Sequence, residues 1–119
     1  MKALFGKTVD MLSALMDYHA ERHKIISSNV ANIDTPGYEA KELKFRDEYL
    51  RLVMKERDGG ADSSAIKPAD RYETLTTAEK VDIDREMSRL AENQLQYNLS
   101  AEFLARKFRG IKNMLTQVK

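Results

Sequence analysis

The strongest constraint on this chain is a heptad pattern of apolar side chains near each of its ends. The pattern covers residues 5–33 in the N-terminal part and residues 83–118 in the C-terminal part. Alternating spacings of four and three place such side chains on one stripe of an α-helix. The sequence therefore predicts two long helices, roughly 43 and 54 Å in length at ~1.5 Å per residue. The stripes consist of Phe5, Val9, Leu12, Met16, His19, His23, Ile26, Val30 and Ile33 in the first helix, and of Ile83, Met87, Leu90, Gln94, Tyr97, Ala101, Leu104, Phe108, Ile111, Leu115 and Val118 in the second.

Both predicted helices carry further apolar side chains beside the main stripe. One neighbouring helix can cover only one stripe, so we expect each helix to contact more than one neighbour. The expected fold class is all-α, with the two terminal helices paired as a coiled coil. Residues 1–38 and 82–119 would form one domain, and residues 39–81 would connect its halves. The additional apolar positions are Leu4, Leu15 and Ile25 in the first helix and Leu95, Leu99, Phe103 and Met114 in the second.

A rigid turn is predicted directly after the first helix. Pro36 fixes φ near the value required at the second position of a tight turn, and Gly37 can take the positive φ of the third position in a type II turn. Thr35 precedes a proline and is therefore excluded from the helical region, so we expect the helix to end by about Asp34.

Short polar side chains surround this turn. Asn29 and Asn32 can bond the amides and carbonyls that a helix end exposes. Tyr38 has an apolar ring with a polar hydroxyl, which suits it to fixing the turn against a neighbour. The candidate functional motif is thus formed by Asn29, Asn32, Thr35, Pro36, Gly37 and Tyr38.

The middle of the chain has a different pattern. Phe45, Tyr49, Leu52 and Val53 follow a helical spacing and predict one short helix near residues 45–56. Two glycines at 59–60 end that pattern. Residues 58–80 show no sustained period, and we expect an irregular, solvated connector there with a short extended piece at 72–76.

Composition limits the function classes. With 119 residues the chain has room for one domain, and its net charge of +1 argues against a bulk nucleic-acid partner. It contains no cysteine, which excludes disulfides and thiol chemistry. The N-terminal residues lack the apolar run of a cleaved signal peptide, and no stretch reaches transmembrane length. We expect no catalytic residues, no cofactor, no bound metal and no membrane insertion.

Two histidines interrupt the first stripe. His19 and His23 stand four residues apart, the spacing of a helical metal pair. A third ligand is missing nearby, and Glu21 does not follow the first histidine directly, as the metalloprotease pattern requires. We therefore favour histidines that are packed and hydrogen-bonded within the stripe.

Two polar features of the second helix leave alternatives open. Gln94 interrupts the apolar stripe, and it either sets the register of helix pairing or is simply a solvated or locally bonded amide. Cations dominate residues 101–119, where Glu102 is the one acidic residue. They could bind nucleic acid or an anionic membrane, but they also complement the dipole at a helix C-terminus, which we favour.

The run SSNVANIDTPGY at residues 27–38 resembles a motif of flagellar basal-body rod, hook and hook-associated proteins, in which two asparagines, Pro-Gly and Tyr follow the N-terminal helix. The C-terminal helix is similar to that of the proximal-rod subunits in this family. It shares their VDIDREM start at 81–87, AENQ at 91–94 and RKF at 106–108. The resemblance covers residues 1–54 and 81–119.

This resemblance implies a non-enzymatic subunit that polymerises through its terminal helices into the periplasmic rod. The implied partners are further copies of the chain, other rod proteins and the membrane-ring adapter FliE. Export would proceed through the flagellar type III apparatus without a cleaved signal peptide. A stand-alone helical-hairpin adaptor and a metal-dependent or hydrolytic enzyme using the two histidines are the alternatives. Together with the stripes, the implied assembly interface is Phe5, Leu12, Ile26, Leu90, Leu95, Tyr97, Leu99, Phe103, Leu104, Phe108, Ile111 and Leu115.

Overall fold

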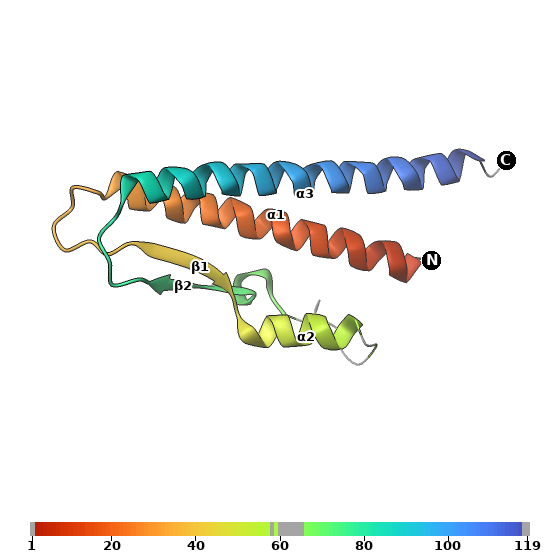
Figure 1. Ribbon diagram of the computed structural model, residues 1–119. Helices are drawn as coiled ribbons and strands as arrows, with labels where there is room; N and C mark the ends of the chain where they lie inside the picture. Colours follow the sequence, from red (N-terminus) through yellow and green to blue (C-terminus); the bar gives the residue numbers. More distant parts are fainter. Residues whose placement is uncertain (1, 58, 60–65, 118–119) are drawn as a thin grey trace. The chain divides into compact units, whose positions relative to one another are not determined.

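The computed structural model describes residues 2–57, 59 and 66–117, with side chains from residue 6 onward and excluding Arg57. Its elements run in the order α1 (Lys2–Ala31), β1 (Lys41–Phe45), α2 (Asp47–Arg57), the 3-10 helix η2 (Pro68–Asp70), β2 (Tyr72–Thr76) and α3 (Ile83–Gln117) (Figure 1). The chain forms two compact units. The first combines residues up to 23 with those from 87 onward, and the second holds residues 24–86.

The two long terminal helices confirm the heptad prediction. α1 ends at Ala31, within the limit set by the residue before Pro36. α3 starts where Asp82 caps it, because the Asp82 carboxylate accepts hydrogen bonds from the backbone N–H groups of Asp84 (3.0 Å) and Arg85 (3.4 Å). Val118, the last predicted stripe position, lies outside the described residues. No described helix is both long and apolar enough to span a membrane.

The all-α prediction is wrong in one respect, because the second unit contains a two-stranded antiparallel sheet. β1 pairs with β2, with Lys41 opposite Thr76 and Phe45 opposite Tyr72. Phe45 therefore ends a strand, whereas the helical spacing had placed it in the short helix, which begins two residues later at Asp47. The extended piece expected at 72–76 is confirmed as β2. β1 has five residues, three of them charged, so its alternation of polar and apolar side chains is too weak to predict a strand from the sequence alone.

Aromatic rings pack where β1 leads into α2. The ring of Phe45 stacks on Tyr49 at 5.7 Å between centroids and meets Tyr72 edge-on at 6.5 Å. The guanidinium of Arg71 lies over the ring of Tyr49, 5.8 Å from its centroid. Leu43 and Tyr49 are both buried, so this cluster is the apolar centre of the short elements in the second unit.

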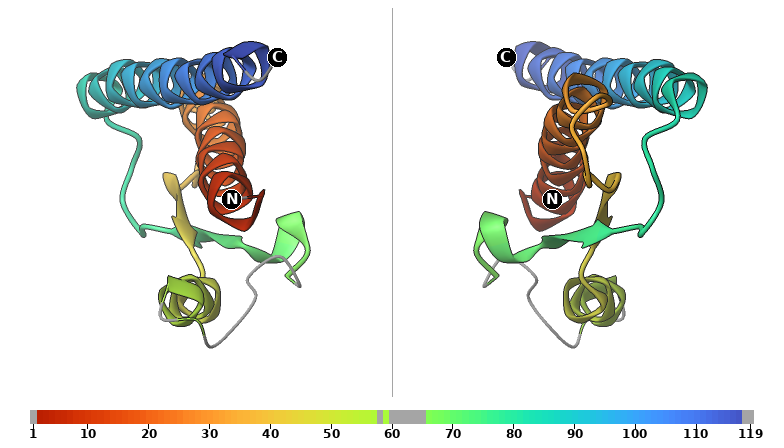
Figure 2. Two further views of the ribbon diagram at one scale, coloured as in Figure 1. Left: turned by 90° about the vertical axis from the view of Figure 1, so that its right-hand side faces the viewer. Right: turned by 90° about the vertical axis from the view of Figure 1, so that its left-hand side faces the viewer.

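Among the described side chains of the first unit, the buried positions are small or polar. They are Ala14 and His19 on α1 and Asn93 and Ser100 on α3. Figures 1 and 2 show the N-terminal end of α1 and the C-terminal end of α3 well apart from each other. The large apolar side chains near the end of α3 accordingly remain exposed.

Replacement of Asp82 by Ala should lower the free energy of unfolding by about 1 kcal/mol, because two backbone N–H groups of α3 lose their acceptor. Asp82→Asn retains a capping oxygen and should cost clearly less. Urea unfolding followed by circular dichroism at 222 nm measures both. Equal losses for the two variants would show that the cap contributes only through its charge.

Candidate functional site at the end of the first helix

The polar motif after α1 is organised around Asn29. This residue lies in the last turns of α1, and its side chain has no exposed surface. A buried carboxamide without partners would cost several kcal/mol, so its donors and acceptor must be satisfied inside the protein.

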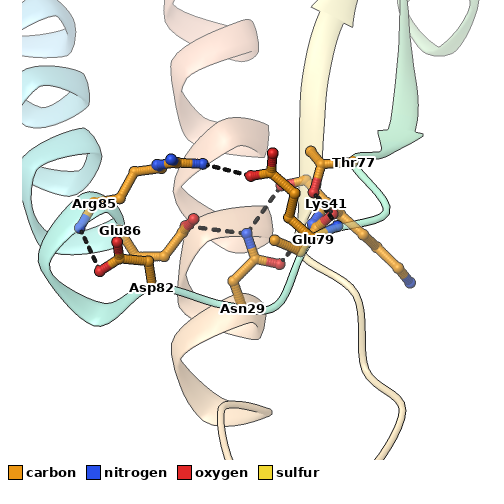
Figure 3. A network of polar contacts seen from close by, with 8 residues as sticks. Asn29, Lys41, Thr77, Glu79, Asp82, Arg85 and Glu86 are labelled. Atoms are coloured by element: carbon orange, nitrogen blue, oxygen red, sulfur yellow. Dashed lines mark hydrogen bonds and ion pairs between the residues drawn. The ribbon is translucent and has the colours of Figure 1, made fainter.

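The carboxamide of Asn29 makes four hydrogen bonds, as many as an asparagine side chain normally can. Its Oδ1 accepts from the backbone N–H of Lys41 at 3.0 Å and from the hydroxyl of Tyr38 at 3.1 Å. Its Nδ2 donates to the backbone carbonyl of Lys41 at 2.9 Å and to Oε2 of Glu86 at 3.0 Å. Figure 3 shows the bonds to Lys41 and Glu86 converging on this one group.

Asn29 thereby connects three segments of the second unit: the end of α1, on which it lies, the start of β1 and the first turn of α3. Its amide bonds both backbone groups of Lys41, as a neighbouring strand would, and so holds the start of β1. The bond to Glu86 holds the first turn of α3, and Glu86 is itself only 1% exposed. The position of the carboxylate near a helix N-terminus is also favourable to its charge.

A second polar group closes the end of α1 itself. Nδ2 of Asn32 donates to the carbonyl of Ser28 at 2.8 Å, and the same carbonyl accepts the backbone N–H of Asn32 at 3.0 Å. Oδ1 of Asn32 accepts from the hydroxyl of Thr35 at 3.1 Å, and the backbone N–H of Thr35 bonds the carbonyl of Asn32. These contacts are local and exposed, in contrast to those of Asn29.

The Pro36–Gly37 turn has the predicted geometry. The N–H of Tyr38 bonds the carbonyl of Thr35 at 3.2 Å, which closes a four-residue turn. Gly37 has φ of 76°, the positive value that the third position of a type II turn requires. The turn directs Tyr38 back so that its hydroxyl reaches Asn29.

Backbone and ionic contacts fix the segment that leads into α3. The N–H of Ala40 bonds the carbonyl of Glu79 at 2.8 Å, and the hydroxyl of Thr77 donates to the carbonyl of Ala40 at 2.9 Å. Glu79 also pairs with Arg85 at 2.8 Å (Figure 3). The hydrogen bond and negative charge of Glu79 raise the pKa of the Arg85 guanidinium above its ordinary value.

In the first unit, His19 meets Asn93 in a two-bond contact. Nδ1 of His19 lies 2.8 Å from Oδ1 of Asn93, and Nδ2 of Asn93 donates to the backbone carbonyl of His19 at 2.7 Å. Because an amide oxygen can only accept, Nδ1 of His19 carries the hydrogen in this contact. The packed, hydrogen-bonded histidine that we favoured is thus found at His19, whereas His23 is exposed.

Asn93, which lies beside the predicted stripe, is buried on α3, whereas its neighbour Gln94 in that stripe is not. Gln94 is exposed, and its amide bonds Asn98 at 3.0 Å on the same helix. The local amide contact, rather than a register contact, is therefore the correct alternative for Gln94 within this structure. In the described part of the chain, no group of three or more possible His, Asp or Glu ligands could hold a metal ion.

The residues expected in an assembly interface fall into three classes. Ile26 is buried, and five others are partly covered by the chain itself. Five more are exposed, with fractions of 48–71%. The side chain of Phe5 lies outside the described ones. The partly covered residues are Leu12, Leu90, Tyr97, Leu104 and Ile111, and the exposed ones are Leu95, Leu99, Phe103, Phe108 and Leu115.

Comparison with known proteins agrees with this geometry. Residues 12–38, which contain most of α1 and the whole motif, match the model of a family described as flagella basal body rod protein. The flagellar basal body rod protein FlgB of Bacillus subtilis is 32% identical over 125 residues, covering 96% of this chain and 97% of that protein. The chain belongs to the FlgB family of flagellar basal body rod proteins. FlgB of Escherichia coli is 29% identical and covers 84% of the chain, and FlgB of Borrelia hermsii is 27% identical and covers 91%.

Membership in this family settles the broad class of the protein. It is a structural component of the flagellar basal body rod, and thus of the motility apparatus, and it assembles with other rod components. It is not an enzyme, so the expectation of a non-enzymatic role is confirmed and the metal-dependent or hydrolytic alternative is excluded.

Asn29→Ala should lower the free energy of unfolding by about 2–3 kcal/mol, because it removes both hydrogen bonds to the backbone of Lys41 and one hydrogen bond to the buried Glu86 carboxylate. Asn32→Ala is the matched control. It removes a partly exposed amide from the same helix end and should cost about 0.5–1 kcal/mol. Denaturant unfolding compares the two. Similar losses would mean that the Asn29 bonds are no stronger than an ordinary helix cap.

Gly37→Val should destabilise the protein by about 1–3 kcal/mol, whereas Gly37→Asn should cost much less, because a β-branched residue resists positive φ and asparagine tolerates it. A Cβ atom at this position meets nothing within 4 Å, so the difference reports backbone strain and not a clash. Thermal unfolding of both variants provides the measurement. Equal transition temperatures would contradict the turn assignment.

Proposed function

We propose that this chain polymerises into the proximal part of the flagellar rod, the drive shaft that crosses the periplasm. In this proposal the terminal helices pair as a coiled coil and pack against further copies and against other rod proteins. The membrane-ring adapter FliE is the proposed neighbour at the base. The chain would reach this place through the flagellar type III export apparatus.

One observation carries the proposal: large apolar side chains are exposed while polar side chains are fully buried. Among the described residues, the largest fully buried side chains are Asn29, Glu86 and Asn93. Large apolar side chains of α3 are at the same time exposed, among them Leu95 at 60% and Leu115 at 71%. If the chain functioned as a monomer, this apolar surface would stay in water, at a free-energy cost of roughly 25 cal/mol per Å².

The arrangement of the exposed residues favours a polymer over a simple pair. Apolar side chains are exposed on α3 from Met87 to Leu115, and Met11 is 53% exposed on α1. Such surfaces mark contact sites when they are extensive. Unlike surfaces that join head to tail produce an open helical filament when the rotation between copies does not close. A rod built from many copies and neighbours requires contacts of this kind.

The buried polar contacts fit the same role. A polar pair inside a helix interface contributes less stability than an apolar pair, but it penalises every register in which the pair is separated. The His19–Asn93 contact is such a pair. We propose that it fixes the register of the two terminal helices, so that the apolar surfaces of α1 and α3 have the same relative position in every subunit.

Phe108→Asp should abolish incorporation into the rod while leaving the fold of the isolated chain almost unchanged. Phe108 is 54% exposed in the single chain, so the substitution removes little internal packing. In an interface it would bury an unpaired carboxylate at a cost of several kcal/mol. The matched control is Asn98→Asp, which adds the same charge at an exposed position of the same helix outside the expected interface.

Swimming in soft agar and recovery of the protein in purified basal bodies measure this prediction, and circular dichroism checks the fold. Normal incorporation of Phe108→Asp would exclude Phe108 from the interface. If the wild-type chain stayed a monodisperse monomer and never entered basal bodies, the proposed polymerisation through the terminal helices would be wrong.

A further inference from the structure

A second stripe on α3 lies wholly on the exposed surface of the first unit. Its positions follow helical spacings of three and four, and every one of them is exposed. We call it the outer stripe. It consists of Ser88, Glu92, Leu95, Leu99, Phe103, Arg106, Gly110, Asn113 and Gln117.

The chemistry of the outer stripe is symmetric about Leu99. Leu95 and Phe103 stand four residues before and after it, and both are large, apolar and about half exposed or more. Glu92 and Arg106 stand seven residues before and after it and carry opposite charges. Ser88 and Gly110 stand eleven residues away on either side and are both small.

We propose that two copies of the chain pair through the outer stripe in an antiparallel, two-fold symmetric dimer with Leu99 on the axis. Leu99 then meets Leu99 of the second copy, and Leu95 meets Phe103 twice. Glu92 of each copy faces Arg106 of the other. Two-fold contacts are self-complementary by construction, and the order of charges along the stripe supplies that complementarity.

An antiparallel arrangement is favoured over a parallel one by these same charges. In a parallel pair in register, Glu92 would face Glu92 and Arg106 would face Arg106, which places like charges together. Within the single chain, Arg106 contacts Glu102 at 3.4 Å, and Glu92 accepts from the amide of Gln96 at 3.4 Å. Both contacts are local and exposed, so they compete weakly with a partner across the dimer.

The consequence of this pairing rests on the proposed function. A two-fold contact closes after two copies and cannot extend in one direction, whereas a rod subunit must point the same way as its neighbours. The dimer would therefore be a state that precedes assembly. It covers the apolar outer stripe and must dissociate before the subunit enters the rod.

Single cysteines provide a direct test, because the sequence contains none. In the antiparallel dimer, Leu99→Cys places two thiols opposite each other, and a short bis-maleimide should join them efficiently. Leu95→Cys should react poorly, since its two thiols would stand about 12 Å apart along the axis at ~1.5 Å per residue. A mixture of Leu95→Cys with Phe103→Cys should again give a crosslinked pair. Equal crosslinking of Leu95→Cys and Leu99→Cys, or none at Leu99→Cys, would overturn the proposal.

Charge reversal tests the ends of the stripe. Glu92→Lys or Arg106→Glu alone creates two like-charged contacts in a symmetric dimer, and each should weaken self-association about ten-fold in sedimentation experiments at low salt. The double variant Glu92→Lys/Arg106→Glu restores opposite charges and should restore the dimer. Failure of the double variant to recover, with helicity unchanged, would contradict the pairing.

These outcomes are separate from those of the rod proposal. Loss of the dimer with normal rod incorporation removes this inference and leaves the rod function standing. A dimer in solution with no incorporation into basal bodies would support the dimer and contradict the proposed polymerisation into the rod.

Discussion

The structure of the second unit depends on one buried carboxamide. Asn29 uses both hydrogen-bonding atoms of its side chain to hold Tyr38, Lys41 and Glu86. Other residue types cannot replace it without loss. An aspartate lacks the two donors and would place a carboxylate beside that of Glu86, a serine offers a single donor, and a glutamine would push its amide outward by one methylene. The motif residues after Asn29 can be understood from this requirement, because the Pro36–Gly37 turn returns Tyr38 to the same group.

The fully buried residues of α3 are polar. Glu86, Asn93 and Ser100 are buried and recur every seven residues along α3. Apolar side chains of the same helix are exposed, including Met87, Leu95 and Leu99. Hydrogen-bonded polar side chains contribute little net stability once desolvation is counted, but they are demanding in geometry. The chain thus has well-defined polar contacts and a small apolar core, and large apolar side chains of α3 stay exposed.

The sequence predicted the helices and the turn well, because both depend on local rules. Heptad spacing, the Asp82 cap and the restrictions imposed by Pro36 and Gly37 act within a few residues. It did not predict β1, whose only strongly buried apolar residue is Leu43 and whose pairing with β2 depends on residues about thirty positions away. The bond from Asn29 to Glu86 crosses 57 positions and could not be found from either residue alone. Of the two alternatives left open for Gln94, the structure shows the local amide contact. The sequence did not single out Asn93, since a heptad pattern does not distinguish adjacent positions on a broad apolar face.

The burial of Asn93 beside the exposed Gln94 shows what determines the inward face of a helix with several apolar stripes. Apolar spacing alone is nearly equivalent for the stripe containing Leu90 and Tyr97 and for the outer stripe containing Leu95 and Leu99, because burial of either gains similar free energy. The polar residues remove this ambiguity. Asn93 bonds the ring and the backbone carbonyl of His19, so rotation of α3 toward another stripe would separate this pair and leave the buried His19 ring without its Asn93 acceptor. The cost of separating this buried polar pair, added to the similar gain of apolar burial on either stripe, favours the inward face that the structure shows.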